Sequence, residues 1–172
     1  MTNSVELSPG LVEWIGLAGM NLIQGAQTDD GRPIIWNKGG ERRYFISAEN
    51  GFYVITSSDR MGSETFHLGA NTMELVEKYL YAHFGGSVRK SRGMERVKKP
   101  FSRDELKEGF HLSEVVFAGR EQDALIDPNG SMVAIAAEDR LVELSHYFNV
   151  SIDTIKESFA HPDGKPLFAP LA

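Results

Sequence analysis

The segment 32–86 constrains the fold more than any other part of the chain, because its apolar pattern changes from that of strands to that of a helix. Three short segments rich in β-branched and aromatic residues come first: Pro33–Asn37, Tyr44–Ser47 and Phe52–Thr56. Gly39-Gly40 separates the first pair and Asn50-Gly51 the second, and both dipeptides are typical of tight hairpin turns. These residues predict a three-stranded antiparallel meander.

A helix is predicted after the meander. The polar stretch Ser57–Glu64 is expected to be a loop. Beyond it, apolar residues recur with the helical period: Met73, Val76, Leu80 and Phe84. The pair Gly85-Gly86 follows, and adjacent glycines favour a helix end. A meander and a helix that lies across it form a folding unit to which the rest of the chain adds.

The remaining segments repeat this plan. Ser8-Pro9 is a typical helix start, and an apolar helix is predicted at Leu11–Ile23. The second half has three strand-like segments and two helical ones: strands at His111–Gly119, Ala124–Asp127 and Met132–Ala136, and helices at Glu138–Phe148 and after the capping residue Ser151. The proline-rich tail is expected to be extended, with Leu167 and Phe168 on the surface.

The order α-βββ-α-βββ-αα predicts an α+β fold, with an antiparallel sheet of about six strands in two meanders and about four helices packed on it. The length of 172 residues suits a single domain over 1–172. Within it, 88–107 is predicted to be a basic, mobile connection. A short strand at Ser87–Arg89 and a helical turn at Ser102–Lys107 are expected there.

Charge and composition narrow the function. Segment 88–107 holds eight Lys and Arg against three acids, so the rest of this chain of net charge −6 carries −11. An acidic body disfavours nucleic acid, since affinity for phosphates needs many basic contacts. There is no cysteine, and we see neither a secretory signal nor an apolar run that could span a bilayer. The expectation is a cytoplasmic protein that binds neither membrane nor nucleic acid.

No motif of nucleotide, metalloprotease or serine-hydrolase chemistry is visible. Asp139, Glu143 and His146 would share a helix face, but three residues on one helix favour a solvated polar face over a metal site. A Ser-dependent hydrolase that uses the loop 57–67, with Ser57 or Ser58 and His67, is an alternative. Serine and aspartate after a strand are ordinary turn residues, so this alternative is the weaker one.

Three features favour protein recognition instead. The loop Thr56–Phe66 presents Arg60 and Met61, the first hairpin tip carries Trp36 with basic residues, and Gly85–Arg89 offers a second loop. Trp and Arg are common binding anchors, although burial of Trp36 in the sheet is an equal alternative. The candidate partner-binding residues are Trp36, Lys38, Arg43, Ser58, Asp59, Arg60, Met61, Gly85, Gly86, Ser87 and Arg89.

Four segments of the chain resemble a known family, the immunity proteins or antitoxins paired with the tuberculosis necrotizing toxin (TNT). They are LVEWIGLAGMNLIQGAQTDDGRPIIWNKGGERRYFI, GFYVITSSDRM, VEKYLYAHFGGSVR and AAEDRLVELSHYFNVSIDTIKESF. Together they cover most of the chain in order. None contains a catalytic signature, so the resemblance depends on its extent.

The resemblance implies a protein that is not an enzyme. TNT hydrolyses NAD, and its antitoxin binds it in the cytoplasm and blocks the NAD-binding site until export. The implied partner is a cognate toxin domain, bound 1:1, and such inhibition needs no cofactor and no metal. An adaptor or chaperone for a secretion system, which holds its cargo without inhibiting it, is the remaining alternative.

Overall fold

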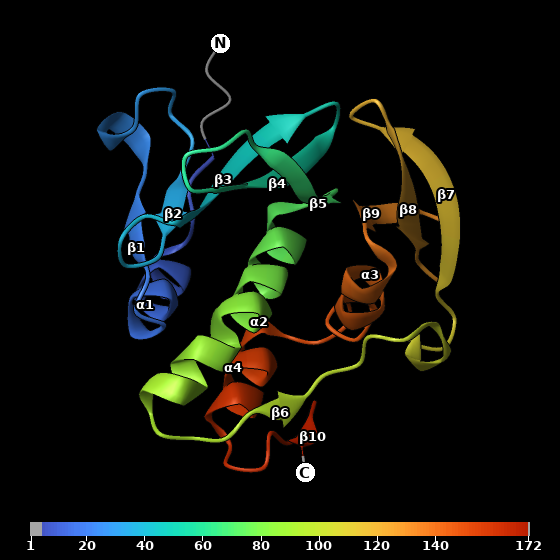
Figure 1. Cartoon of the computed structure of the whole chain (residues 1–172). Coiled ribbons are helices and arrows are strands. Elements are labelled where there is room, and N and C mark those ends of the chain that lie inside the picture. Colours follow the sequence, from blue (N-terminus) through green and yellow to red (C-terminus); the bar gives the residue numbers. More distant parts are fainter. Residues whose placement is uncertain (1–4, 172) are drawn as a thin grey trace.

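The computed structural model describes residues 5–171 as an α+β fold in which an eight-stranded antiparallel sheet packs against helices (Figure 1). The order of strands is β1-β2-β3-β4-β5-β9-β8-β7, and β6 and β10 form a separate pair. The elements are α1 Pro9–Leu17, β1 Asn21–Ile23, the 3₁₀ turn η1 Gly25–Gln27, β2 Ile34–Trp36, β3 Arg42–Glu49, β4 Phe52–Asp59, β5 Thr65–Ala70, α2 Met73–Ser91, β6 Val97–Lys98, the 3₁₀ turn η2 Arg103–Glu105, β7 His111–Phe117, β8 Arg120–Ile126, β9 Met132–Ala136, α3 Glu138–Ser145, α4 Ile152–Ala160 and β10 Ala169–Pro170.

The sheet consists of two meanders joined edge to edge, as the sequence predicts. β5 of the first meander pairs with β9 of the second, so that Leu68 lies opposite Ala136 and Ala70 opposite Ala134. The large sheet has eight strands where six were predicted, because β1 and β5 are strands that the pattern did not indicate. The predicted class, α+β with an antiparallel sheet, is confirmed.

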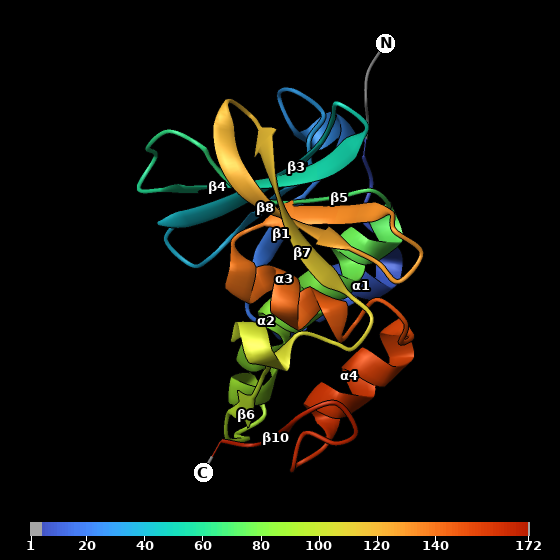
Figure 2. The same cartoon turned by 90° about the vertical axis from the view of Figure 1, so that its right-hand side faces the viewer.

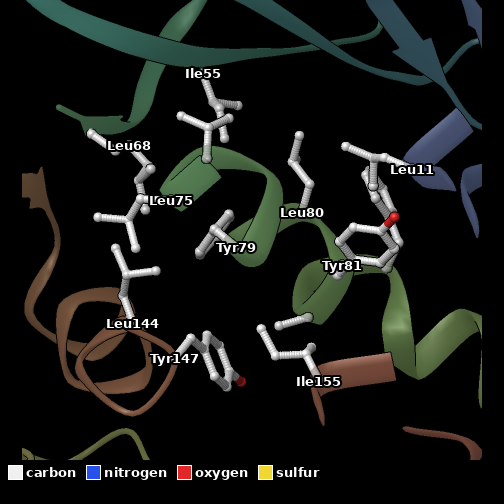
Figure 3. Close-up of a cluster of buried hydrophobic side chains, with 14 of the residues drawn as sticks. Leu11, Ile55, Leu68, Leu75, Tyr79, Leu80, Tyr81, Leu144, Tyr147 and Ile155 are labelled. Carbon is white, nitrogen blue, oxygen red and sulfur yellow. The ribbon is translucent and has the colours of Figure 1, made fainter. Parts of the chain in front are cut away.

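The core lies between one face of the sheet and the helices, with α2 at its centre (Figures 1 and 2). Figure 3 shows Tyr79 and Leu80 of α2 among side chains from the sheet, α1, α3 and α4. A polar bond is buried in this core as well, since the indole N–H of Trp14 donates to the carbonyl of Tyr81 at 3.0 Å. No helix within residues 5–171 combines the length and apolar character that crossing a bilayer requires.

Helix α1 is shorter than predicted, and the prediction of a helix to Ile23 is wrong. Gly19 adopts a φ of +81°, which ends the helix in the left-handed conformation that glycine allows. The N–H of Met20 bonds to the carbonyl of Ile15 at 3.1 Å, and the N–H of Gly19 to that of Gly16 at 3.0 Å. This hydrogen-bonded end frees Asn21–Ile23 to pair with β2 as an edge strand.

Helix α2 runs through Gly85-Gly86 to Ser91, so the predicted helix end at the glycines is wrong. Gly85 is buried where α4 crosses, and a Cβ there would lie 2.5 Å from the ring of Phe159. The absence of a side chain therefore allows two helices to approach closely. The strand predicted at Ser87–Arg89 is wrong for the same reason, because these residues continue the helix.

The segment 88–107 contains the last turn of α2, strand β6 and η2. The helical turn predicted at Ser102–Lys107 is confirmed, and Ser102 and Glu105 cap it reciprocally. The tail returns alongside this segment, since β10 pairs with β6. Phe168 packs on Tyr147 and Phe159 and is buried, so its predicted surface position is wrong.

Candidate partner-binding site

A hollow of about 510 Å³ lies at the end of the sheet where β1–β2 and the β4–β5 turn meet. Four of the predicted contact residues come together around it: Trp36, Arg43, Arg60 and Met61. The other lining residues are Ile23, Ile34, Gly39, Gly40 and Glu41. Two separate hairpins therefore supply one surface.

Strand register explains which side chains face the hollow. Side chains alternate between the two faces of a strand, and Trp36, Arg43 and Ser58 are direct neighbours across three strands. They lie on the face of the sheet turned away from the helices. Their neighbours Arg42 and Asp59 lie on the other face, where they form an ion pair at 3.3 Å.

The serines of the predicted loop Ser57–Glu64 belong to a strand. β4 continues to Asp59 and pairs with β3 as far as Arg42, so only the residues after Asp59 form the turn. Ser57 and Ser58 are buried on opposite faces of the sheet. This corrects the prediction of a loop from Ser57 onward, and it places Ser58 beside Arg43 instead of at a flexible tip.

The turn after β4 is held in an uncommon conformation. Arg60 and Met61 both have positive φ angles, +49° and +64°, as a type I′ turn requires. The N–H of Arg60 donates to the carbonyl of Glu41 at 2.6 Å, and that of Gly62 to Asp59 at 2.8 Å. Left-handed residues other than glycine cost about 1 kcal/mol or more and cluster at ligand-contacting segments. The turn therefore presents Met61, which is 73% exposed, from a defined backbone.

Two buried polar atoms on this face of the sheet have no hydrogen-bond partner within residues 5–171, and one of them belongs to Arg43, which lines the hollow. The Nε of Arg43 and the Oγ of Ser58 are both buried without a hydrogen bond. The Arg43 guanidinium lies 5.5 Å from the ring centre of Phe45, on the same face of the sheet. A buried donor without an acceptor is unfavourable by about 1–3 kcal/mol.

Arg32, which stacks on the same Phe45 ring at 4.6 Å, differs from Arg43 because it is fully paired. It donates to Asp30 at 2.7 Å and to both oxygens of Glu64 at 2.7 and 2.9 Å. The side-chain bond from Arg32 lowers the pKa of Glu64, and the backbone N–H of Arg32 lowers that of Asp30. Arg32 and Arg43 thus lie against the same aromatic ring, and Arg32 is already bonded to two carboxylates.

Three of the predicted contact residues of this region do not line the hollow, and Ser58, buried beside Arg43, is one of them. Lys38 is exposed at the hairpin tip and does not line the hollow. Asp59 faces the helix side and is engaged by Arg42. Conversely, Ile23 and Ile34 form part of the wall and were not predicted. For Ile23 the available signal was the short apolar run Leu22-Ile23, but the predicted helix to Ile23 concealed it.

The prediction that Gly85–Arg89 forms a second loop is wrong, because these residues belong to α2. Arg89 is 1% exposed and donates four hydrogen bonds to backbone carbonyls: those of Glu95, Phe159, His161 and Pro162. Its role is to tie α2 to the end of α4. Gly86 and Ser87 remain exposed and line a separate hollow of about 640 Å³.

The residues of the hydrolase alternative do not form a serine–histidine pair. The Nε2 of His67 lies 2.6 Å from the hydroxyl of Tyr79, and no hydrogen bond joins His67 to Ser57 or Ser58 in the part of the chain that the structure describes. Burial lowers the pKa of His67 to about 3, with a further contribution from Arg140. Ser58 lies on the other face of the sheet from His67.

The polar residues considered for a metal are also occupied elsewhere. Glu143 accepts from the Tyr147 hydroxyl and pairs with Lys99 at 3.2 Å. His146 bonds to the carbonyl of Glu105 at 2.6 Å. Residues 5–171 contain no group of three or more His, Asp or Glu side chains placed to hold a metal ion.

Comparison with known proteins covers nearly the whole chain. Residues 14–167 match the family Imm61, Immunity protein 61. The chain is 55% identical over 168 residues to "Immunity factor for TNT" of Mycobacterium tuberculosis (strain ATCC 25618 / H37Rv), covering 98% of this chain and 96% of that protein. The same figures hold for "Immunity factor for TNT homolog" of Mycobacterium bovis (strain BCG / Pasteur 1173P2).

A solved structure shows the same fold. It is described as Rv3902c from M. tuberculosis, is 53% identical, and superposes with a TM-score of 0.95 over 99% of this chain and 98% of that one. The sequence match, the structural match and the resemblance seen in the sequence agree over the same residues. This chain belongs to the immunity protein 61 family.

Proposed function

We propose that this chain is an immunity protein for a toxin of the TNT class and that it inhibits the toxin by covering its active site. The observation that carries the proposal is the 55% identity, across 98% of the chain, to a protein named for immunity to TNT. The resemblance implies a toxin that hydrolyses NAD. A 1:1 complex in the cytoplasm would protect the producing cell, and inhibition by occupancy requires no reaction by the inhibitor.

The geometry of the hollow supports this mode of action. Met61 projects from a hydrogen-bonded turn, and a wall of apolar residues with two arginines lies directly behind it. A pre-organised projection beside a hollow can enter a partner's cleft while a group of the partner enters the hollow. Tight inhibition at subnanomolar concentration needs about −12 kcal/mol, which a few central anchors in an interface of ordinary size supply.

The test uses the purified chain and the purified toxin domain. Binding is measured by calorimetry, and NAD hydrolysis by the toxin is followed with increasing amounts of the chain. We expect a 1:1 complex and complete inhibition that added NAD relieves competitively. A chain that binds without slowing hydrolysis would be an adaptor, and the proposed inhibition would then be wrong.

A matched pair of variants locates the contact. Met61 and Val116 are both 73% exposed, but Met61 lines the hollow while Val116 lies on β7, the edge strand at the opposite end of the sheet order. Met61→Asp places a charge in the proposed interface and is expected to weaken binding at least tenfold. Val116→Asp is expected to leave it unchanged. Equal effects of the two substitutions would contradict the proposed site.

A further inference from the structure

The side chains that line the hollow carry more positive than negative charge. Arg43 and Arg60 line it, and neither forms an ion pair within residues 5–171. Glu41 is the one acidic residue in the lining, and it is exposed at the rim. The hollow is therefore locally cationic in a chain of net charge −6. That sign favours an anionic group from a partner, because burial of like charges is unfavourable.

The arginine that lines the hollow specifies the shape of that group. The Nε of Arg43 has no hydrogen-bond partner within residues 5–171, and Ser58, its neighbour on β4, is 3% exposed and does not line the hollow. A guanidinium presents its Nε–H and one Nη–H as a fork that matches the two oxygens of a carboxylate. A carboxylate in the hollow would match this fork, and Arg60 adds a second guanidinium to the lining.

The apolar wall restricts where the carboxylate is carried. Ile23, Ile34, Trp36 and Met61 surround the arginines with hydrocarbon and an indole ring. Apolar surroundings exclude water from an ion pair, which strengthens the pair, and they leave no polar partner for the chain that carries the charge. The group that enters is therefore an acidic side chain flanked by apolar residues.

Arg32 gives an internal precedent for this arrangement. It stacks on the same ring as Arg43 and binds the carboxylates of Asp30 and Glu64, in one case with two parallel bonds. Arg43 has the same aromatic support, and its place for a carboxylate is not taken by any residue of 5–171. The two positions show what a satisfied and an unsatisfied arginine look like on one sheet face.

We propose that the hollow is a receptor for one aspartate or glutamate side chain of the toxin, held by the Arg43 fork and Arg60. This inference deepens the proposed function and rests on it. Arg43 is then the anchor that selects the toxin, and the Met61 turn is the wall that closes over the acidic side chain.

The first experiment compares substitutions at Arg43 in toxin binding. Arg43→Met keeps the length of the side chain and removes its donors, and we expect the Kd to rise 30-fold or more. Arg43→Lys keeps the charge but not the fork, so we expect it to recover only part of that loss. Arg120→Met removes an exposed arginine at the start of β8 and is expected to leave the Kd unchanged.

Folding is measured on the same proteins by urea unfolding. Since Arg43 and Ser58 carry unpartnered donors in the free chain, Arg43→Met and Ser58→Ala are expected to unfold at the wild-type urea concentration or above it. A loss of binding accompanied by unfolding of both variants would assign these residues a structural role and overturn the inference.

The second experiment identifies the acidic side chain itself. Each Asp and Glu on the surface of the toxin domain is replaced by Asn or Gln, and the binding of every variant is measured with wild type and with Arg43→Met. We expect one acidic residue whose replacement weakens binding to wild type at least tenfold but has little effect on binding to Arg43→Met. Such non-additivity is the signature of a direct pair.

The outcomes separate the inference from the proposed function. If wild type binds and inhibits the toxin but Arg43→Met does so equally well, or no acidic residue of the toxin couples to Arg43, the carboxylate receptor is wrong and the immunity function stands. If wild type does not bind the toxin at all, both fall together.

Discussion

Two regions of this molecule each offer an arginine and small residues, and they differ in how fully the fold uses them. At the end of α2, Arg89 gives all its bonds to backbone carbonyls, and Gly85 lies against Phe159. At the end of the sheet, Arg43 and Ser58 keep unpartnered polar atoms beside a projecting turn. The residue types alone do not distinguish an internal brace from a contact site. Their hydrogen-bond partners do.

Replacing Arg89 is expected to have the largest effect. Arg89→Met removes the donors of four buried or half-buried carbonyls, and the free energy of unfolding should fall by about 4 kcal/mol. Urea unfolding measures this change. Arg92→Met, at the exposed C-cap of the same helix, should change it by less than about 0.5 kcal/mol. Similar values for the two variants would show that Arg89 is not an internal brace.

Alanine substitutions at the adjacent glycines Gly85 and Gly86 are expected to change the stability of the fold in opposite directions. Gly85→Ala forces a methyl group into the ring of Phe159, which should destabilise the fold by about 2–3 kcal/mol. At Gly86 nothing lies within 4 Å of a new Cβ, so Gly86→Ala should stabilise the helix by about 0.5–1 kcal/mol. Thermal unfolding of the two variants compares them. A stable Gly85→Ala protein would show that α2 and α4 do not pack this closely.

The stability of the fold is also expected to fall in acid, because of histidines on the helix-covered side of the sheet. Burial lowers the pKa of His67 to about 3 and that of His83 to about 4, both below the ordinary value of 6.5. In the unfolded chain the two histidines take up protons at a higher pH than in the folded chain. The stability that depends on their neutral form is therefore complete above pH 6.5 and is lost as the pH falls towards the two lowered pKa values. For His67 the loss is about 2 kcal/mol at pH 5.

Urea unfolding between pH 7 and pH 5 measures this loss. His67→Gln should make the profile less steep, since it removes one of the two buried histidines that titrate. His111→Gln, at an exposed position on β7, should leave the slope as in wild type. An unchanged slope in His67→Gln would show that the acid sensitivity arises elsewhere.

The smallest predicted effect concerns the rim of the hollow. Trp36→Ala should weaken toxin binding by about 1.4 kcal/mol, or tenfold, because the indole forms part of the wall that excludes water. Phe101, an exposed aromatic residue remote from the hollow in sequence and absent from its lining, is the matched control. Calorimetry compares toxin binding by Trp36→Ala and Phe101→Ala. If both substitutions weakened binding equally, the proposed difference between the regions would be wrong.

Local signals predicted the parts of the site that depend on turns. The hairpin glycines placed Trp36 near a tip, and the polar residues after β4 placed Arg60 and Met61 in a turn, because turn chemistry is encoded within a few residues. The orientation of Ser58 and Arg43 toward one face required the register of β3 with β4. The strand β5 was missed although it pairs with the neighbouring β4, and its second partner, β9, lies more than sixty residues later in the chain.

The errors at α2 have a comparable cause. Two consecutive glycines are a sound local signal for a helix end, but Phe159 packs over Gly85 and Arg89 collects carbonyls from Glu95 and the end of α4. These long-range contacts supply more free energy than the intrinsic cost of two glycines, about 1 kcal/mol each. The helix therefore continues to Ser91.

By itself the sequence determined the α+β class, the two meanders, the helix starts at capping residues and the likeness to immunity proteins, since each depends on short-range patterns or on extended similarity. Tertiary structure alone decided which arginine is internal and which keeps an unpartnered donor beside the hollow. An arginine is driven to satisfy its donors wherever carbonyls or carboxylates converge, and that convergence arises only when segments distant in the chain are brought together.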